Sequence, residues 1–333
     1  MAGIIFAKNS AVNDDLWKVN DQVVRSILMD TATEKNKDDE LVKALFNEKK
    51  SKKFGEKMTG LTEMGNFEIV DEGDAGIQDE LQQGFSKLIE HKQFIKTFVC
   101  TAEMNEDNDI DSMKVAAQNF VRAYKRTRAQ YASDALTKEG ATFLWGSRTL
   151  DKTTGDGKAL FATDHLGKKS GIANQSNVYT NAFGTNTLML NTLQNIGRNF
   201  LNDSGFVTGY TYDTIVIPGN CPALEDTIKK IIRSDLVVGS NFNDVNPQKG
   251  LWKLVVDHRW VVASGSPYIL MSSEANSELQ GSVFYDRVAL TMKDWVDEKT
   301  FNLNWSGRAR FSAGFYNWRH VILGGATSGT TLS

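Results

Sequence analysis

The chain has few of the residues from which metal sites, disulfide frameworks and catalytic centres are usually built. Its 333 residues include two cysteines and four histidines. Cys100 and Cys221 fit no metal-ligand spacing, and two cysteines do not make a disulfide framework. The histidines lack His-x-x-x-His or related spacing; they are His91, His165, His258 and His320. We therefore expect reduced thiols, no bound metal and no cofactor.

Long hydrophobic runs and an excess of basic charge are also absent. Residues 1–8 contain too short an apolar run for a signal peptide, and no segment approaches the ~20 apolar residues of a membrane span. The formal net charge is −3 at pH 7, which is not the basic footprint of a dedicated nucleic-acid binder. We expect no membrane partner and a chain that stays in the compartment where it is made.

Proline is scarce and confined to the second half of the chain. The four prolines are Pro218, Pro222, Pro247 and Pro267. The first half therefore has few rigid interruptions, and its shape must come from helices, hairpins and glycines.

The most distinctive segment that is present runs from 140 to 180 and is rich in Gly, Ser, Thr and Asn. A stretch this long without periodicity is usually functional or a linker. Its apolar residues argue against disorder; they are Phe143, Leu144, Trp145, Leu160, Phe161 and Tyr179. We predict an ordered strap that lies along other structure, as expected of a chain shaped for contact with copies of itself.

Hydrophobic periodicity predicts the elements of the first half. Helices are expected over 13–30 and 38–50, the second ending in a solvated charge run at 48–53. A long glycine-punctuated hairpin arm is expected over 54–92, with residues 67–70 in its outgoing strand. A strand follows at 93–101, and acidic residues before 110 and basic residues after 121 favour a long helix over 110–137.

In the second half, helices and strands alternate from 182 to 282 and predict an α/β subdomain. The helices are expected at 186–202 and 222–232, and the strands at 211–217, 251–256, 260–263 and 268–271. The tail is strand-rich, with strands expected at 288–293, 301–305 and 309–321, and the last residues are expected to fray. The fold class is α+β.

Catalytic patterns are weak. Asp164-His165 is the only adjacent acid–histidine pair near a loop, and a histidine that bonds to loop backbone is the favoured interpretation. Gly155-x-Gly157-Lys158 lacks the spacing of a phosphate-binding loop. We expect no catalytic residue and no enzyme activity.

The order of segments resembles the major capsid proteins of tailed bacteriophages. The most specific pieces are the strap sequence GDGKALFATDH at 155–165, the predicted helix at 193–205, and YDTIVIPG at 212–219. The turn NDVNP at 243–247 is also similar. The resemblance covers nearly the whole chain from about 50 to 324.

This resemblance implies the Hong Kong phage-type capsid fold. The implied divisions are an N-terminal arm (1–53), an E-loop hairpin (54–92), a P-domain with a long spine helix (93–181 and 283–324), an A-domain (182–282) and a frayed tail (325–333).

The resemblance also implies a function and partners. The chain would self-assemble as pentamers and hexamers into the icosahedral shell around the DNA genome of a tailed phage, and would form part of the virion after assembly in the host bacterial cytoplasm. Implied partners are scaffold, portal and head-completion or decoration proteins, with non-specific contact to packaged double-stranded DNA. Two alternatives are an encapsulin-like compartment and, from another class, a metal-dependent hydrolase that uses Asp164 and His165.

Charge patterning suggests how neighbouring subunits meet. The far end of the hairpin arm is acidic, whereas the long helix is basic. We expect contact across a subunit boundary between two sets of residues, which are Glu68, Asp71, Glu72 and Asp74 on the arm and Arg122, Lys125, Arg126 and Arg128 on the helix.

Overall fold

The structure is a computed structural model that describes residues 5–6, 17–67, 69–72, 82–107, 109–180, 182–184, 188–238 and 244–325. Backbone proximity divides the chain into two compact units. Unit 1 comprises residues 1–56, 89–132 and 284–313, and unit 2 comprises residues 57–88, 133–283 and 314–333. These two units do not test the expected division into arm, hairpin, P-domain and A-domain, which remains a prediction.

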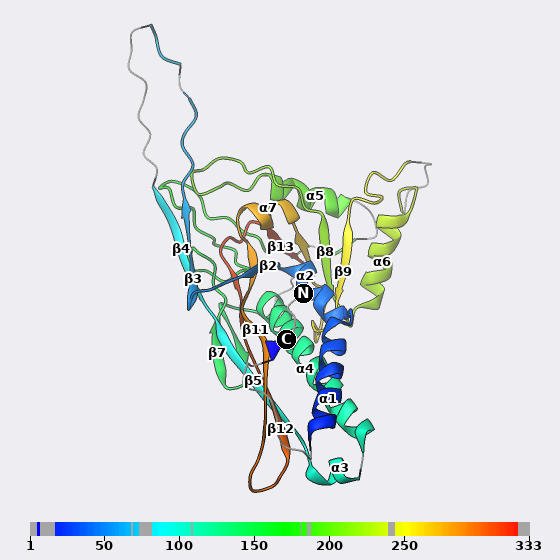
Figure 1. Cartoon of the computed structure of the whole chain (residues 1–333). Coiled ribbons are helices and arrows are strands. Elements are labelled where there is room, and N and C mark those ends of the chain that lie inside the picture. Colours follow the sequence, from blue (N-terminus) through cyan, green and yellow to red (C-terminus); the bar gives the residue numbers. More distant parts are fainter. Residues whose placement is uncertain are drawn as a thin grey trace. The chain divides into compact units, whose positions relative to one another are not determined.

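Unit 1 is built on a five-stranded sheet whose main path runs β1-β11-β12-β5, with β2 also paired to β11 (Figure 1). The strands are β1 (Ile5–Phe6), β2 (Asn47–Lys50), β5 (Lys92–Cys100), β11 (Ser282–Val296) and β12 (Leu303–Phe315), and the ends of β11 and β12 extend into unit 2. Strands β5 and β12 are antiparallel, with Phe94 opposite Ala309 and Phe98 opposite Trp305.

Four helices belong to this unit, and α1 and α4 contact the sheet. They are α1 (Lys18–Thr33), α2 (Lys37–Leu45), α3 (Ala102–Glu106) and α4 (Ile110–Thr137), whose last turn lies in unit 2. The rings of Phe94 and Phe311 stack at 4.1 Å, and Tyr131 of α4 meets both of them edge-on. The expected helix 110–137 agrees with α4 because its aromatic stripe is long enough to cover the paired strands.

Unit 2 contains a four-stranded sheet in the order β13-β10-β8-β9. Its strands are β8 (Thr214–Pro218), β9 (Lys253–Asp257), β10 (Tyr268–Met271) and β13 (Val321–Gly324). Strands β8 and β9 are parallel, and every residue of β8 is buried. The unit also contains α5 (Leu188–Arg198), α6 (Pro222–Arg233), α7 (Ser273–Glu278) and the short hairpin of β6 (Thr142–Trp145) and β7 (Arg148–Asp151).

The strands expected at 301–305 and 309–321 are a single strand, β12, which ends at Phe315. Three further expectations about elements were wrong. The helix expected over 38–50 ends at Leu45, because the backbone of Phe46 is extended and residues 47–50 pair with β11 as an edge strand. The expected strand 260–263 is irregular, since Trp260 and Val262 bond to the turn at 219–220. Residues 67, 69 and 70 form no strand, because the hairpin ladder ends before them. Hairpin β6–β7 and helix α7 were not anticipated.

Candidate assembly surface

The hairpin in unit 2 ends in a loop whose described residues, 63–67 and 69–72, are exposed. Strands β3 (Gly55–Leu61) and β4 (Gln83–Glu90) pair with one another. The pairing closes at Thr62, whose amide donates to the Gln82 carbonyl at 3.0 Å and whose Oγ1 accepts from the Gln82 amide at 2.9 Å. Beyond this closure, residues 63–67 continue past the end of β3 (Figure 1).

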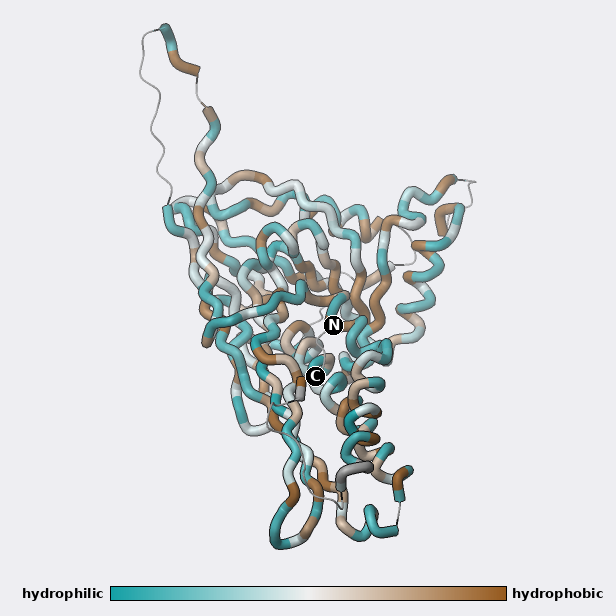
Figure 2. Tube along the Cα trace, in the orientation of Figure 1, coloured by the Kyte–Doolittle hydropathy of each residue, from teal (hydrophilic) through white to brown (hydrophobic). Residues whose placement is uncertain are grey.

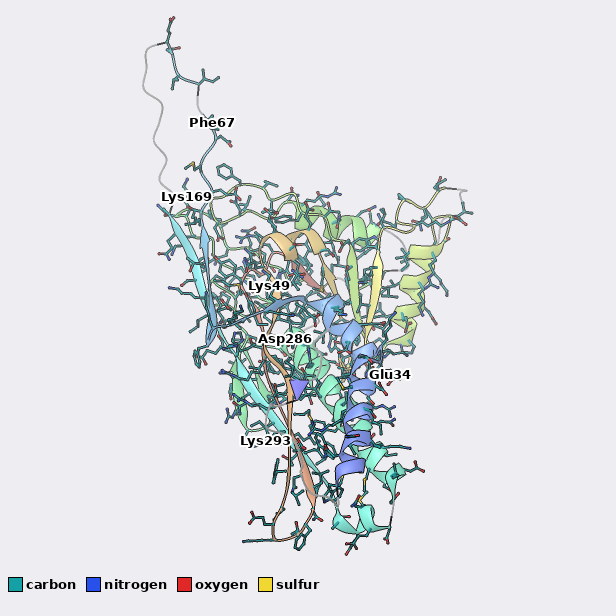
Figure 3. The ribbon with its side chains drawn as sticks, in the orientation of Figure 1. Glu34, Lys49, Phe67, Lys169, Asp286 and Lys293 are labelled. Atoms are coloured by element: carbon teal, nitrogen blue, oxygen red, sulfur yellow. The ribbon has the colours of Figure 1, made fainter. Side chains whose placement is uncertain are left out.

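This loop exposes large apolar side chains. Phe67 is 106% exposed and Ile69 is 101% exposed relative to their reference states, and Met64 is 57% exposed. Figure 3 labels Phe67, and Figure 2 colours residues 69–70 as hydrophobic at the tip. Large apolar side chains exposed together in one loop favour an interaction surface.

The same loop is strongly acidic. Between Thr62 and Gln82 the sequence has seven acidic residues and no basic one. Asp71 and Glu72 are exposed. Glu68 and Asp74 lie outside the described residues. The loop therefore offers an apolar and negatively charged surface.

The base of the hairpin is held to its own unit. The Tyr316 hydroxyl donates to the Phe85 carbonyl at 2.8 Å, and an added Cβ on Gly60 would lie 2.2 Å from that hydroxyl oxygen. The Ser204 hydroxyl donates to the Glu63 carbonyl at 2.9 Å. These contacts fix the base, whereas the described residues nearer the tip, 69–72, are exposed.

The four basic residues predicted on the long helix divide into two pairs. Arg122 and Arg126 are exposed on α4, whereas Lys125 and Arg128 are each only 5% exposed. Lys125 donates to the Glu34 carbonyl at 2.6 Å and lies 3.4 Å from the Asp39 carboxylate. This lysine thereby connects α4 to the segment that joins α1 and α2.

Arg128 is buried in an ion-pair network inside unit 1. Its Nη2 lies 3.0 Å from a carboxylate oxygen of Glu48 and 3.0 Å from one of Asp286, and its guanidinium stacks over Phe284 at 5.0 Å. Burial raises the pKa of Asp286 in spite of this arginine. Arg128 follows Tyr124 by four residues and precedes Tyr131 by three, so helical periodicity already placed it in the apolar stripe.

The structure thus leaves Arg122 and Arg126 as the helix residues available to a neighbour. The described ion pairs of Lys125 and Arg128 lie within the chain and do not involve the hairpin loop.

Asp164 and His165 do not form the acid–histidine pair that a hydrolase would need. The carboxylate of Asp164 pairs with Lys158. His165 is fully buried, stacks on Trp318 at 4.3 Å, and its Nδ1 lies 2.8 Å from Asp156 Oδ2. Within the described ranges, no group of three or more His, Cys, Asp or Glu side chains could hold a metal ion. A structural role fits His165.

Asp156 organises the strap. Its carboxylate faces His165 Nδ1 and accepts from the Thr154 hydroxyl and from the amides of Lys158 and Leu166. Burial alone would raise the pKa of Asp156, but the hydrogen bonds from His165 and Thr154 outweigh it and lower the pKa. The sequence motif around 155–165 is therefore a half-buried loop organised by the carboxylate of Asp156.

No described helix is long and apolar enough to cross a membrane. A search of curated proteins gave no match. Solved structures share the fold at low sequence identity. A structure from Mycobacterium phage Patience is 11% identical, with a TM-score of 0.55 and coverage of 100% of this chain and 95% of that chain.

Two further structures agree. The capsid of an empty GTA particle is 10% identical, with a TM-score of 0.53 and coverage of 85% of this chain and 88% of that one. The capsid of Myoviridae Phage XM1 is 10% identical, with a TM-score of 0.52 and coverage of 84% and 88%. A family model described as phage capsid protein matches residues 85–323, which is more than half of the chain. The chain has the Hong Kong phage-type arrangement of helices and sheets. It belongs to the phage capsid protein family and is a structural major capsid protein.

Proposed function

We propose that this chain assembles as pentamers and hexamers into a closed icosahedral shell around the double-stranded DNA genome of a tailed phage. One observation carries the proposal, which is that a chain of the capsid family exposes an apolar, acidic hairpin loop. An isolated two-stranded arm is marginal in water and gains stability by lying on another surface. A second copy would supply that surface.

The proposal includes partners and a location. Scaffold, portal and head-completion or decoration proteins would act with the shell, and its inner surface would contact packaged DNA without sequence preference. Assembly would take place in the host bacterial cytoplasm and the product would be the virion. The buried, internally bonded state of His165 supports a protein without catalytic residues.

At the contact between copies, exposed Asp71 and Glu72 on the loop would pair with Arg122 and Arg126 on α4 of a neighbour. These four residues carry exposed charges of opposite sign. Glu68 and Asp74 extend the acidic set in sequence. Lys125 and Arg128 would serve the interior of their own subunit.

Electron microscopy and sedimentation velocity of the purified chain test the proposal. We expect shells or capsomers from the intact chain, and soluble subunits that do not assemble when residues 63–81 are replaced by a short glycine-rich turn after Thr62. An intact chain that sediments as a monomer under all salt and crowding conditions would contradict the proposal. Particles from the native source that hold protein cargo in place of DNA would favour the encapsulin-like alternative.

A further inference from the structure

Two buried carboxyl groups share one arginine where α1 meets β11. Arg25 of α1 donates through Nε to Asp21 Oδ2 at 2.8 Å and through Nη2 to Asp294 Oδ2 at 2.8 Å. The Asp294 side chain is 0% exposed and that of Asp21 is 10% exposed. The guanidinium also lies over the Trp305 ring, 5.4 Å from its centroid.

One oxygen of each carboxyl group has no donor. Oδ1 of Asp21 and Oδ1 of Asp294 are buried without a hydrogen-bond partner among the described atoms. With both groups ionised, two negative charges face one positive charge away from water. Buried charges that are not fully paired are costly. Among the described side chains, this site therefore has one positive charge for two carboxylates and no donor for either Oδ1.

A single proton supplies both. Shared by the two carboxyl groups, which interact with one another, it would supply a donor and neutralise the excess charge, as in carboxyl pairs that share a proton. A metal ion fits less well, because the adjacent guanidinium repels it and only two carboxylates are present. We propose that Asp21, Arg25 and Asp294 form a proton-controlled latch that holds α1 on β11. This latch does not depend on the shell function.

The surroundings of Asp21 determine whether acid strengthens or weakens the latch. Burial raises the pKa of Asp21, and the charge and hydrogen bonding of Asp294 raise it further, while Arg25 opposes both. Arg25 and Asp294 are the charged groups that act on Asp21 among the described side chains. A folded pKa above the ordinary value of 3.8 means that the folded chain binds the proton more tightly than the unfolded chain. The latch is therefore closed in acid and weakens as the pH rises through that raised pKa.

At neutral pH the latch would hold α1 loosely. Val24 and Leu28 still anchor α1, since they are 1% and 0% exposed, so the unrelieved charge would lower the local stability of the helix without releasing it.

Amide hydrogen exchange of residues 18–33 in the full chain tests the latch, with rates corrected for the intrinsic pH dependence. Asp21→Asn keeps the shape of the side chain and adds a permanent donor toward Asp294. We expect it to slow exchange of α1 at pH 7 by about two- to tenfold, the lower part of the range of coupling between contacting residues. It should also remove the dependence of protection on pH between 4 and 7. Asp30→Asn, at an exposed position of the same helix, is the matched control and should change nothing.

A second variant separates the latch from a simple ion pair. Asp294→Asn should protect α1 at pH 7 as Asp21→Asn does, whereas the double variant leaves Arg25 without a carboxylate and should lose protection. If Asp21→Asn instead speeds α1 exchange at pH 7 as Arg25→Gln does, Asp21 is only the partner of Arg25 and the proposal is wrong. Unchanged exchange in Asp21→Asn would overturn it as well.

Discussion

Single buried polar residues determine the local shape of the strap. Asp156 receives its hydrogen bonds from four residues that span 154–166, whereas Asp164 has a half-exposed lysine as its partner. The sequence places Asp164 next to His165, but the carboxylate that contacts the histidine is that of Asp156, nine residues before it. Closeness in sequence does not show which carboxylate will contact a histidine once the loop has folded.

We predict that Asp156→Asn destabilises the chain by about 1–3 kcal/mol, the cost of losing hydrogen bonds to a charged group. Asp164→Asn, as control, should cost about 0–1 kcal/mol, as for exposed ion pairs. Urea denaturation at pH 7 measures both. Because the pKa of Asp156 is lowered, its contribution is present above the ordinary pKa near 3.8 and is lost as the pH falls through the lowered value. The difference from the parent chain should therefore shrink in acid, and equal losses for both variants would refute this role.

His320 supplies a second test at this scale. It is fully buried, its Nδ1 donates to the Asn317 carbonyl at 2.8 Å and its Nε2 accepts from the Ser282 hydroxyl at 2.6 Å. Burial lowers the pKa of His320 to about 3. The folded chain therefore binds this proton less readily than the unfolded chain, so the stability is complete above about pH 6.5 and declines as the pH falls toward 3.

His320→Gln keeps a neutral side chain that can donate and accept. Between pH 7.5 and 5 we expect the parent chain to lose about 2 kcal/mol through this histidine, because each pH unit between the two pKa values is worth about 1.4 kcal/mol. The variant should not lose this increment, while the exposed control His258→Gln should behave as the parent does. Denaturation midpoints at the two pH values measure it, and parallel losses in all three chains would exclude His320 as the cause.

At the scale of elements, close packing of Gly60 against Tyr316 fixes the hairpin base. An added methyl group at Gly60 would lie 2.2 Å from the tyrosine oxygen and force the hydroxyl away from the Phe85 carbonyl. The pairing of β3 and β4 alone would not orient the arm, because two-stranded ribbons twist freely.

We predict that Gly60→Ala loosens this base by about 1–3 kcal/mol, the usual cost of overpacking. Hydrogen exchange of residues 57–61 and 83–88 should rise while β8 and β10 stay protected. Tyr316→Phe is the matched variant, since it removes the hydroxyl that clashes and the hydrogen bond together. Gly60→Ala should then lower stability less in the Tyr316→Phe variant than in the parent chain. Equal losses in both backgrounds would show that the two residues do not interact.

At the scale of the whole molecule, exposed ion pairs that are weak individually can add up when many copies assemble. A single pair of loop and helix charges contributes only about 0.2–1 kcal/mol. Many copies in one shell would sum such terms, and the pattern of charges would select the register of neighbouring subunits more than it would raise affinity.

We predict that Arg122→Glu with Arg126→Glu raises the protein concentration needed for assembly, and that adding Asp71→Lys with Glu72→Lys partly restores it. High salt should weaken assembly of the parent chain because it screens exposed charges. Arg148→Glu, at an exposed site of β7, serves as the control. Light scattering against protein concentration measures assembly. If the reversed helix charges leave empty shells intact and lower only DNA retention, the basic face contacts DNA and the pairing is wrong.

The sequence by itself determined the features that depend on local periodicity. The limits of α4 and of β10 follow from an apolar stripe and a short β-branched and aromatic run, and both agree with the structure. The resemblance carried by the strap and the segments after it was enough to predict the capsid fold, which the family match over 85–323 confirms.

Only the tertiary structure decided the features that depend on distant partners. Residues 47–50 became a strand because β11 offered a free edge, and a charged run carries no signal for that pairing. Arg128 is buried because Glu48 and Asp286 converge on it from positions 80 and 158 residues away. Arg25 meets Asp294 of β11 across 269 residues and holds it beside Asp21. Periodicity predicts which face of an element is buried. Which residues contact that face depends on how distant parts of the chain pack together.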